Sequence, residues 1–172
     1  TFYGKFATDL IASSSQQILI YRPLVPIHSL RRLHVIVPPR GEFDPGLKHW
    51  CRRIATLAEQ TACRVSVYGE ERTLRAVEGA WQAERRSLSA DFHKFTPAEG
   101  LAGVAARTRP DHMAVFVLAR RGMPSYHRRL EDIPGQLERY FSARSWMLIV
   151  PAALGSSSSS ADGRNALTLS DR

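Results

Sequence analysis

Five short strand-like runs alternate with helix-like segments along most of this chain, and this alternation constrains its fold more than any other feature. The runs are His34–Val37, Arg64–Tyr68, Asp91–Phe95, His112–Ala119 and Trp146–Val150. The most hydrophobic of them, His112–Ala119, is typical of a central strand that is covered on both faces. Strands that alternate with helices are joined by right-handed crossovers, which make the strands parallel. We therefore predict an α/β fold with a doubly wound, five-stranded parallel sheet and helices on both faces.

The segments between the runs carry helix signals of their own. Asp44 followed by Pro45 predicts an N-cap with proline at the first helical position. The segment Thr96–Glu99 has the pattern of a capping box and predicts the start of a later helix. Apolar residues recur at helical spacing on one face of these segments, and we expect their tryptophans in the core. The inward residues are Leu47, Trp50, Cys51, Ile54, Leu57 and Ala58, then Leu74, Val77 and Trp81, then Leu101, Val104 and Ala105.

The beginning of the chain repeats the helix-then-strand order of its end. The helix-like Phe6–Ser14 leads into the apolar Ile18–Tyr21, as Gln136–Phe141 leads into Met147–Val150. We expect this chain to be an excised piece of a longer protein. Residues 1–22 are then the closing helix and strand of a preceding domain. On this interpretation residues 23–29 are a linker and residues 30–151 form a complete second domain. The serine-rich stretch after residue 154 predicts a disordered C-terminal tail over residues 152–172.

The charge of the chain is strongly positive, with 24 Lys and Arg against 16 Asp and Glu and a formal net charge of +8. Such a surface attracts nucleic acids, nucleotides or acidic lipid head groups, and it is also compatible with an ordinary solvated surface. The arginine pairs are dispersed and are not interleaved with stacking aromatic residues, which disfavours nucleic-acid binding. The longest apolar run, Met113–Ala119, is far shorter than the ~20 residues of a membrane-spanning helix.

Motifs that would mark an enzyme or a metal site are missing from the sequence. It contains no G-x-S-x-G, no H-E-x-x-H and no G-x-x-x-x-G-K-[ST] pattern. The six histidines occur singly, and no two of them have the i, i+4 spacing that holds a metal ion on a helix. Cys51 and Cys63 lack a C-x-x-C spacing and are expected to be reduced core thiols. We therefore predict a protein that is not an enzyme and has no metal site.

A strand ending near residue 37, a long amphipathic helix, and a last strand ending in proline together resemble the universal stress protein family. The resemblance implies a universal stress protein-like (adenine nucleotide alpha hydrolase-like) fold. Members that bind ATP carry a glycine-rich stretch after the fourth strand and often an aspartate after the first. Here the fourth loop keeps one glycine, and Pro38 stands where that aspartate would be. The phosphate-cradling pattern is broken, so any nucleotide would bind weakly. The candidate anion or nucleotide loops are Val37, Pro38, Arg120, Arg121 and Gly122.

A closer resemblance lies in three segments, Phe6–Arg22, Leu30–Pro39 and Glu42–Trp50, which look like the cytosolic tail of bacterial monovalent cation:proton antiporters. This resemblance implies a non-catalytic regulatory or assembly domain on the cytoplasmic side of the inner membrane. The implied partners are the transmembrane sodium/proton exchanger domain of the same parent chain and a second copy in a homodimer. The positive charge of the chain adds an acidic lipid surface as a further candidate partner. The alternative is a universal-stress-type module that binds an adenine nucleotide or a cyclic dinucleotide.

Overall fold

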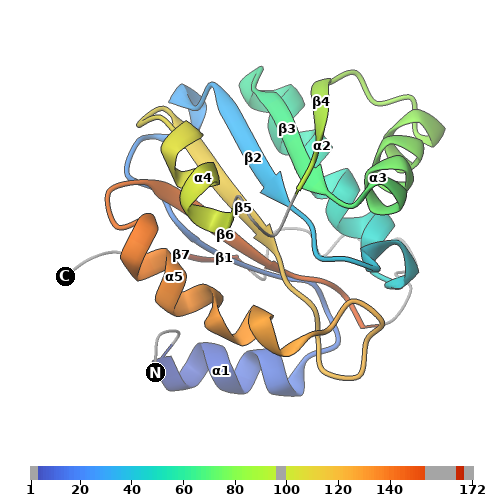
Figure 1. The fold of residues 1–172 in the computed structure, drawn as a ribbon, viewed down its shortest axis with the longest axis vertical. Coiled ribbons are helices and arrows are strands. Elements are labelled where there is room, and N and C mark those ends of the chain that lie inside the picture. Colours follow the sequence, from blue (N-terminus) through green and yellow to red (C-terminus); the bar gives the residue numbers. More distant parts are fainter. Residues whose placement is uncertain (1–3, 96–99, 154–165, 169–172) are drawn as a thin grey trace.

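The structure is a computed structural model that describes residues 4–95, 100–153 and 166–168. In this part of the chain, five α-helices flank a mixed, mostly parallel sheet in the strand order β4-β3-β2-β5-β6-β1-β7 (Figure 1). The strands are β1 (Ile18–Arg22), β2 (Arg32–Ile36), β3 (Arg64–Gly69), β4 (Ser89–Lys94), β5 (His112–Val117), β6 (Ser145–Val150) and β7 (Ala166–Thr168). The helices are α1 (Gly4–Ser13), α2 (Leu47–Thr61), α3 (Glu71–Ala83), α4 (Gly100–Arg107) and α5 (Ile133–Tyr140), with 3₁₀ turns η1 (Ile27–Ser29), η2 (Gly41–Phe43) and η3 (Arg128–Asp132).

The five predicted strands are present and pair in parallel, which confirms the α/β fold predicted from the alternation. The strand order reverses between β2 and β5, because β3 and β4 lie on one side of β2 while β5 and β6 lie on the other. Helices α2 and α3 bury their apolar residues against one core cluster, and α4 and α5 bury theirs against a second. The two clusters lie on opposite faces, since alternate residues of the same strands belong to each. The sheet is larger than predicted, because β1 and β7 extend it.

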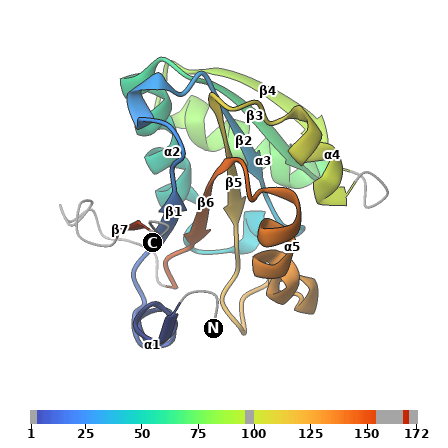
Figure 2. The same cartoon turned by 90° about the vertical axis from the view of Figure 1, so that its left-hand side faces the viewer.

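The first helix and strand add to the same sheet. Strand β1 pairs antiparallel with β6 along its whole length, from Ile18 opposite Val150 to Arg22 opposite Trp146. Because the side chains of β1 alternate between the two faces, they contribute to both core clusters. Leu10 and Ile11 of α1 pack against the same core cluster as α5. Figure 2 shows β1 and β6 side by side, with α1 near the end where β1 begins.

The predicted inward stripes of the helices are confirmed in the core. Trp50 is 1% exposed and Trp81 is 4% exposed. The Trp81 indole Nε1 donates a hydrogen bond of 2.7 Å to the carbonyl oxygen of Cys51, so the polar atom of this buried ring has a partner. Both cysteines, Cys51 and Cys63, are buried and free. The aromatic residues of α2 and α3 are therefore part of the packing.

The predicted start of α2 is wrong. Helix α2 begins at Leu47, and Gly46 is its N-cap residue without a side-chain capping bond. The buried carboxylate of Asp44 instead accepts hydrogen bonds from the amide and the hydroxyl of Ser125, in the loop after β5. Gly46 packs closely on the end of β6, because a Cβ there would lie 2.7 Å from the carbonyl oxygen of Ala152. Contacts distant in sequence thus decide the conformation before α2. The capping box predicted at Thr96–Glu99 lies outside the described residues.

The predicted disordered tail does not hold at its described residues. Ala152 is buried, and the amide of Ala153 donates a hydrogen bond of 2.8 Å to the carbonyl oxygen of Ser15. Residues 166–168 form β7, which pairs in parallel with β1. The physical reason is that β1 would otherwise present an unpaired edge, and β7 supplies hydrogen-bonding partners for it. The serine run at residues 156–160 lies outside the described residues.

The predicted linker at residues 23–29 also makes contacts, since the amide of Leu24 donates a hydrogen bond of 2.8 Å to Ser145 Oγ and Ile27–Ser29 form the turn η1. Among the helices of residues 4–95 and 100–153, none combines the length and apolar character needed to cross a bilayer.

Candidate functional site

The loops predicted to hold an anion lie at the carboxyl ends of β2 and β5, which are neighbours in the sheet. Ligands dock at this edge of doubly wound sheets, at the place where the strand order reverses. Val37 and Pro38 are buried, and the amide of Val37 donates a hydrogen bond of 2.9 Å to the carbonyl oxygen of Tyr68. The structure therefore brings the two loops to one edge, but the Val37 amide continues the strand pairing and is not directed at a ligand.

Arg120 is used to join segments of the fold. Its guanidinium donates hydrogen bonds to three carbonyl oxygens, those of Ile11 at 2.7 Å, Gln16 at 2.7 Å and Pro151 at 2.9 Å. The Ile11 carbonyl belongs to the last turn of α1, where the helix dipole is negative and favours a cation. Burial lowers the pKa of Arg120. These bonds connect the end of α1 and the start of β1 to the end of β6. The guanidinium of Arg120 therefore binds backbone carbonyl oxygens of the fold.

Arg121 and Gly122 have different roles in the same loop. Arg121 is exposed, and its guanidinium lies 2.7 Å from a carboxylate oxygen of Glu131. Glu131 also accepts a hydrogen bond from the Tyr126 hydroxyl, and these two donors lower the pKa of its carboxyl group. Gly122 has a φ of +85°, a left-handed conformation that a side chain would disfavour. The single glycine of the loop thus serves a turn, and the exposed cation beside it has a carboxylate partner.

A cavity of about 850 Å³ lies beside this loop, between it and α1. This volume is within the usual range of small-molecule sites. Its walls are mostly apolar, with Arg121, Glu131 and Tyr126 among the polar groups. The apolar lining consists of Ile11, Ala12, Leu118, Ala119, Met123, Leu130, Pro134, Val150 and Ala153.

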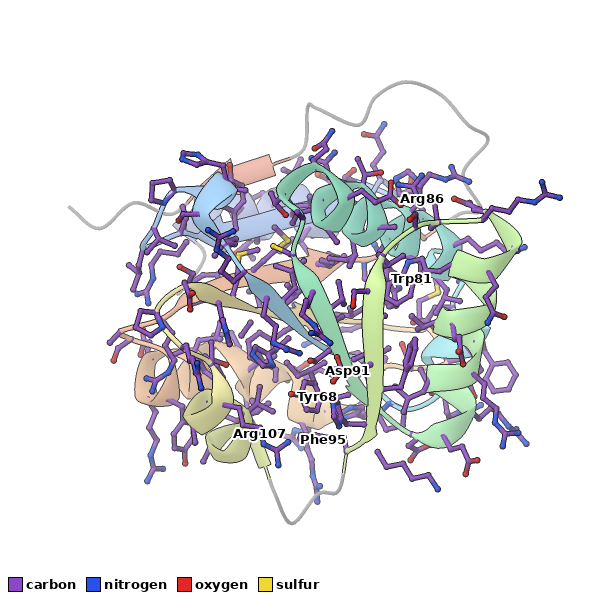
Figure 3. All side chains as sticks on the ribbon, turned by 90° about the horizontal axis from the view of Figure 1, so that it is seen from above. Tyr68, Trp81, Arg86, Asp91, Phe95 and Arg107 are labelled. Carbon is purple, nitrogen blue, oxygen red and sulfur yellow. The ribbon has the colours of Figure 1, made fainter. Side chains whose placement is uncertain are left out.

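A second group of polar side chains lies on one face of the sheet and was missed in the sequence. We call it the histidine–tyrosine network. Alternate residues of β2, β3 and β4 are polar, and β5 adds the residue at its start. Strands alternate their side chains between faces, so polar residues at every second position indicate a polar face on each strand. Only the pairing of the strands shows that these polar residues lie side by side. Figure 3 shows Tyr68 and Trp81 on opposite sides of β4. The members of the network are Arg32, His34, Ser66, Tyr68, Asp91, His93 and His112.

The inner part of the network is built around His34, which is 3% exposed. Its Nδ1 lies 3.0 Å from the Tyr68 hydroxyl and its Nε2 lies 2.9 Å from Nδ1 of His112. The ring of Tyr68 stacks on His93, with 5.1 Å between the ring centroids. His93 is exposed, so hydrogen bonds and ring contacts lead from the buried His34 to the surface.

The outer part of the network is built around Asp91. One carboxylate oxygen accepts a hydrogen bond of 2.9 Å from Ser66, and the other lies 2.6 Å from Nε2 of His93. Arg32 donates to Ser66 at 2.7 Å and lies 3.4 Å from Asp91. Burial opposes ionisation of Asp91, but the bonds from His93 and Ser66 outweigh it and lower the pKa of the carboxyl group. The carboxylate is thus held ionised.

The electrostatics keep the buried imidazoles neutral. Burial lowers the pKa of His34 to about 4, and the charges of His112, Arg32 and Arg107 act in the same direction. Burial also lowers the pKa of His112, although nearby Asp111 opposes this. Two neutral imidazoles can share one hydrogen bond, in which one ring donates and the other accepts. The arrangement can pass a proton between rings. Among the described residues, no three His, Cys, Asp or Glu side chains are grouped so as to hold a metal ion.

Comparison of the chain with models of protein families, with curated proteins and with solved structures gave no match.

Proposed function

We propose that this chain is a universal stress protein-like, non-catalytic regulatory and assembly domain from the cytosolic part of a bacterial monovalent cation:proton antiporter. The observation that carries the proposal is the antiparallel pairing of β1 with β6, which is centred on Ile20 opposite Leu148. It places the helix–strand unit α1–β1 against the helix–strand unit α5–β6 in opposite directions. Such an arrangement is expected if residues 4–22 close an earlier domain of the same fold and the two domains meet through their last strands.

The two units share the length of the connection between helix and strand. The connection between helix and strand has four residues in each unit, residues 14–17 and residues 141–144. An arginine holds backbone carbonyls of each connection. Arg120 donates to Gln16, and Arg22 donates to Phe141 at 2.8 Å and to Ser142 at 2.9 Å. The equal connections support two copies of one helix–strand unit that are joined back to back. The two arginines lie at non-equivalent places, Arg22 at the end of β1 and Arg120 after β5, and they fasten the units together.

The loops at the carboxyl edge of the sheet support a non-catalytic role. A phosphate cradle needs backbone N–H groups that converge on an open site. Here the Val37 amide is bonded to Tyr68, and Arg120 is bonded to three carbonyl oxygens. The Val37 amide extends the β2–β3 pairing, and Arg120 stabilises the joint between α1, β1 and β6. We infer that the joint transmits or limits movement between the two parts of the tail, and that the transmembrane exchanger of the parent chain is its partner. Because β1 occupies the edge of β6, a homodimer of this chain uses another surface.

The exchange activity of the parent chain tests this proposal. The full parent chain and a version that ends before residue 30 of this sequence would be compared in everted membrane vesicles, from cells without their own sodium/proton antiporters. The collapse of a proton gradient on addition of Na⁺ or K⁺ is the readout. We expect exchange to persist in the shortened chain with its apparent cation affinity changed by about fivefold or more. A parent gene without a membrane exchanger, or exchange that is indifferent to the deletion, would refute the proposal.

The second candidate function is binding of an adenine nucleotide or a cyclic dinucleotide. The 850 Å³ cavity beside Arg121 favours it, because it lies at the edge where doubly wound sheets take ligands. Ligand binding to the folded state raises the Tm. A saturable rise with ATP, AMP or a cyclic dinucleotide, abolished by Arg121→Ala and kept by the exposed control Arg72→Ala, would favour this function over a purely structural one.

A further inference from the structure

The dispersed arginines of the sequence gather at one edge of the folded chain. Strands β2 to β6 are parallel, so their amino ends lie at the same edge, and each of these ends is at or near arginine. We call this surface the arginine edge. It consists of Arg31, Arg32, Arg64, Arg85, Arg86, Arg107, Arg109 and Arg144.

Hydrogen bonds show that the segments of this edge are neighbours. The amide of Arg64 donates to the carbonyl oxygen of Arg31 at 3.0 Å, and the amide of Arg31 donates to Asp111 at 2.8 Å. The side chain of Arg144 donates to the carbonyl oxygen of Thr108 at 3.0 Å. The ends of β3, β2, β5 and β6 therefore form a continuous row, about 14 Å wide at the usual spacing of strands.

The negative charges at this edge do not balance the arginines. Glu59 lies 3.0 Å from Arg86, and Glu84 lies 2.7 Å from Arg52 of α2, so both are already paired. Asp91 lies 3.4 Å from Arg32, and Asp111 lies 3.7 Å from His112. Four exposed arginines form no ion pair and no side-chain hydrogen bond with any residue that the structure describes. They are Arg31, Arg64, Arg85 and Arg109.

We propose that the arginine edge docks this domain on an anionic lipid bilayer. Basic residues beside a bilayer that contains anionic lipids are attracted to its negative surface potential. The described loops of this edge carry no exposed Phe, Tyr or Trp on which bases could stack, which disfavours single-stranded nucleic acid. The 850 Å³ cavity lies at the opposite edge, and none of these arginines lines it. A broad row of arginines, four of which have no side-chain partner among the described residues, fits a flat anionic surface.

Docking through this edge goes beyond the proposed function, because it depends on the charges of this chain alone. In an antiporter tail it would hold the amino edge of the sheet against the membrane and direct the carboxyl edge, with Arg121, toward the cytosol. The vesicle experiment below needs no exchanger, and the exchange experiment needs no lipid binding. Failure of one is therefore distinguishable from failure of the other.

The experiment is co-sedimentation of the whole chain with vesicles of phosphatidylcholine containing about a third phosphatidylglycerol. The test variant carries Arg31→Gln, Arg64→Gln and Arg109→Gln. The matched control carries Arg72→Gln, Arg128→Gln and Arg129→Gln, which removes the same charge from exposed positions toward the carboxyl edge. We expect binding to neutral vesicles to be absent, binding to anionic vesicles to fall with added salt, and the test variant to bind about a hundredfold more weakly than the control.

Three outcomes would overturn the inference. They are equal loss in both variants, binding that ignores lipid charge, and tighter binding to a DNA oligonucleotide than to the vesicles with the same dependence on the arginine edge. Arginines near the carboxyl ends of helices also stabilise those helices through the helix dipole. Thermal unfolding of both variants is therefore measured in parallel. A test variant that keeps its Tm and loses vesicle binding isolates the docking role. The salt dependence of the unaltered chain tests the inference without any substitution.

Discussion

The Nε2 of His34 lies 2.9 Å from the Nδ1 of His112, and one of these two rings is buried in the sheet face while the other reaches its amino edge. Protonation of both rings would place two positive charges at hydrogen-bonding distance. Arg32 and Arg107 add further positive charge, and Asp91 is the acidic group that opposes them at His34. The pair is therefore stable only while at least one ring is neutral.

The stability of the chain should fall in mild acid because of His34. Its pKa in the folded state is about 4, below the ordinary value of 6.5, so the unfolded chain binds a proton first as the pH falls. The contribution of the neutral ring is complete above pH 6.5 and is lost progressively toward pH 4. We expect the free energy of unfolding to drop by about 2 kcal/mol between pH 7 and pH 5, as measured by urea denaturation.

Substitution of the histidine should flatten that pH dependence. His34→Leu removes the buried titrating group and leaves the Tyr68 hydroxyl and His112 without this partner, so the variant should be less stable at neutral pH but lose less in acid. His28→Gln changes an exposed histidine and should keep the full pH dependence. An unchanged slope in His34→Leu would show that other groups cause the loss.

Arg120 should contribute to stability rather than to ligand binding. Arg120→Met removes three hydrogen bonds to carbonyl oxygens and is expected to lower the free energy of unfolding by about 2 kcal/mol. The adjacent, exposed Arg121 makes a surface ion pair, so Arg121→Met should change it by less than about 0.5 kcal/mol. Hydrogen exchange should also become faster in β1 of the Arg120 variant. Equal effects of the two substitutions on the free energy of unfolding would contradict the role of Arg120 in holding α1, β1 and β6 together.

The first helix and strand should suppress self-association. A chain that begins at Pro23 lacks β1 and exposes the edge of β6, whose residues are all buried in the full chain. Exposed edges of apolar strands pair with other chains. Light scattering should therefore show a larger mass or aggregation for the shortened chain than for the full chain at the same concentration. A shortened chain that stays monomeric would mean that β6 finds another cover.

The two cysteines should be inert in the folded protein. Burial raises the pKa of both Cys51 and Cys63, which disfavours the reactive thiolate. The Sγ of Cys63 also donates a hydrogen bond of 3.1 Å to the carbonyl oxygen of Leu30. A thiol reagent such as DTNB should label neither cysteine until urea unfolds the chain, and should then label both. Rapid labelling of the native protein would show that one thiol is accessible.

Local patterns determined the elements of this fold. Apolar runs such as His112–Ala119 identified the parallel strands, and helical spacing identified the buried faces with Trp50 and Trp81, because burial of apolar side chains follows the period of each element. The start of α2 was wrong, since the carboxylate of Asp44 found a partner in Ser125, 81 residues away, and not in its own helix. A short-range signal cannot include a competitor from a distant loop.

Only the tertiary structure decided what the polar residues do. The sequence predicted that Arg120 belongs to an anion loop. In the fold, its guanidinium binds the carbonyl oxygens of Ile11, Gln16 and Pro151, which come from distant parts of the chain. The histidines occur singly in the sequence, yet strand pairing places His34 against His112. The arginine edge arises in the same way from the parallel alignment of strand ends. Sequence fixes which elements form, because that depends on neighbours along the chain, whereas a site depends on which elements become neighbours in space.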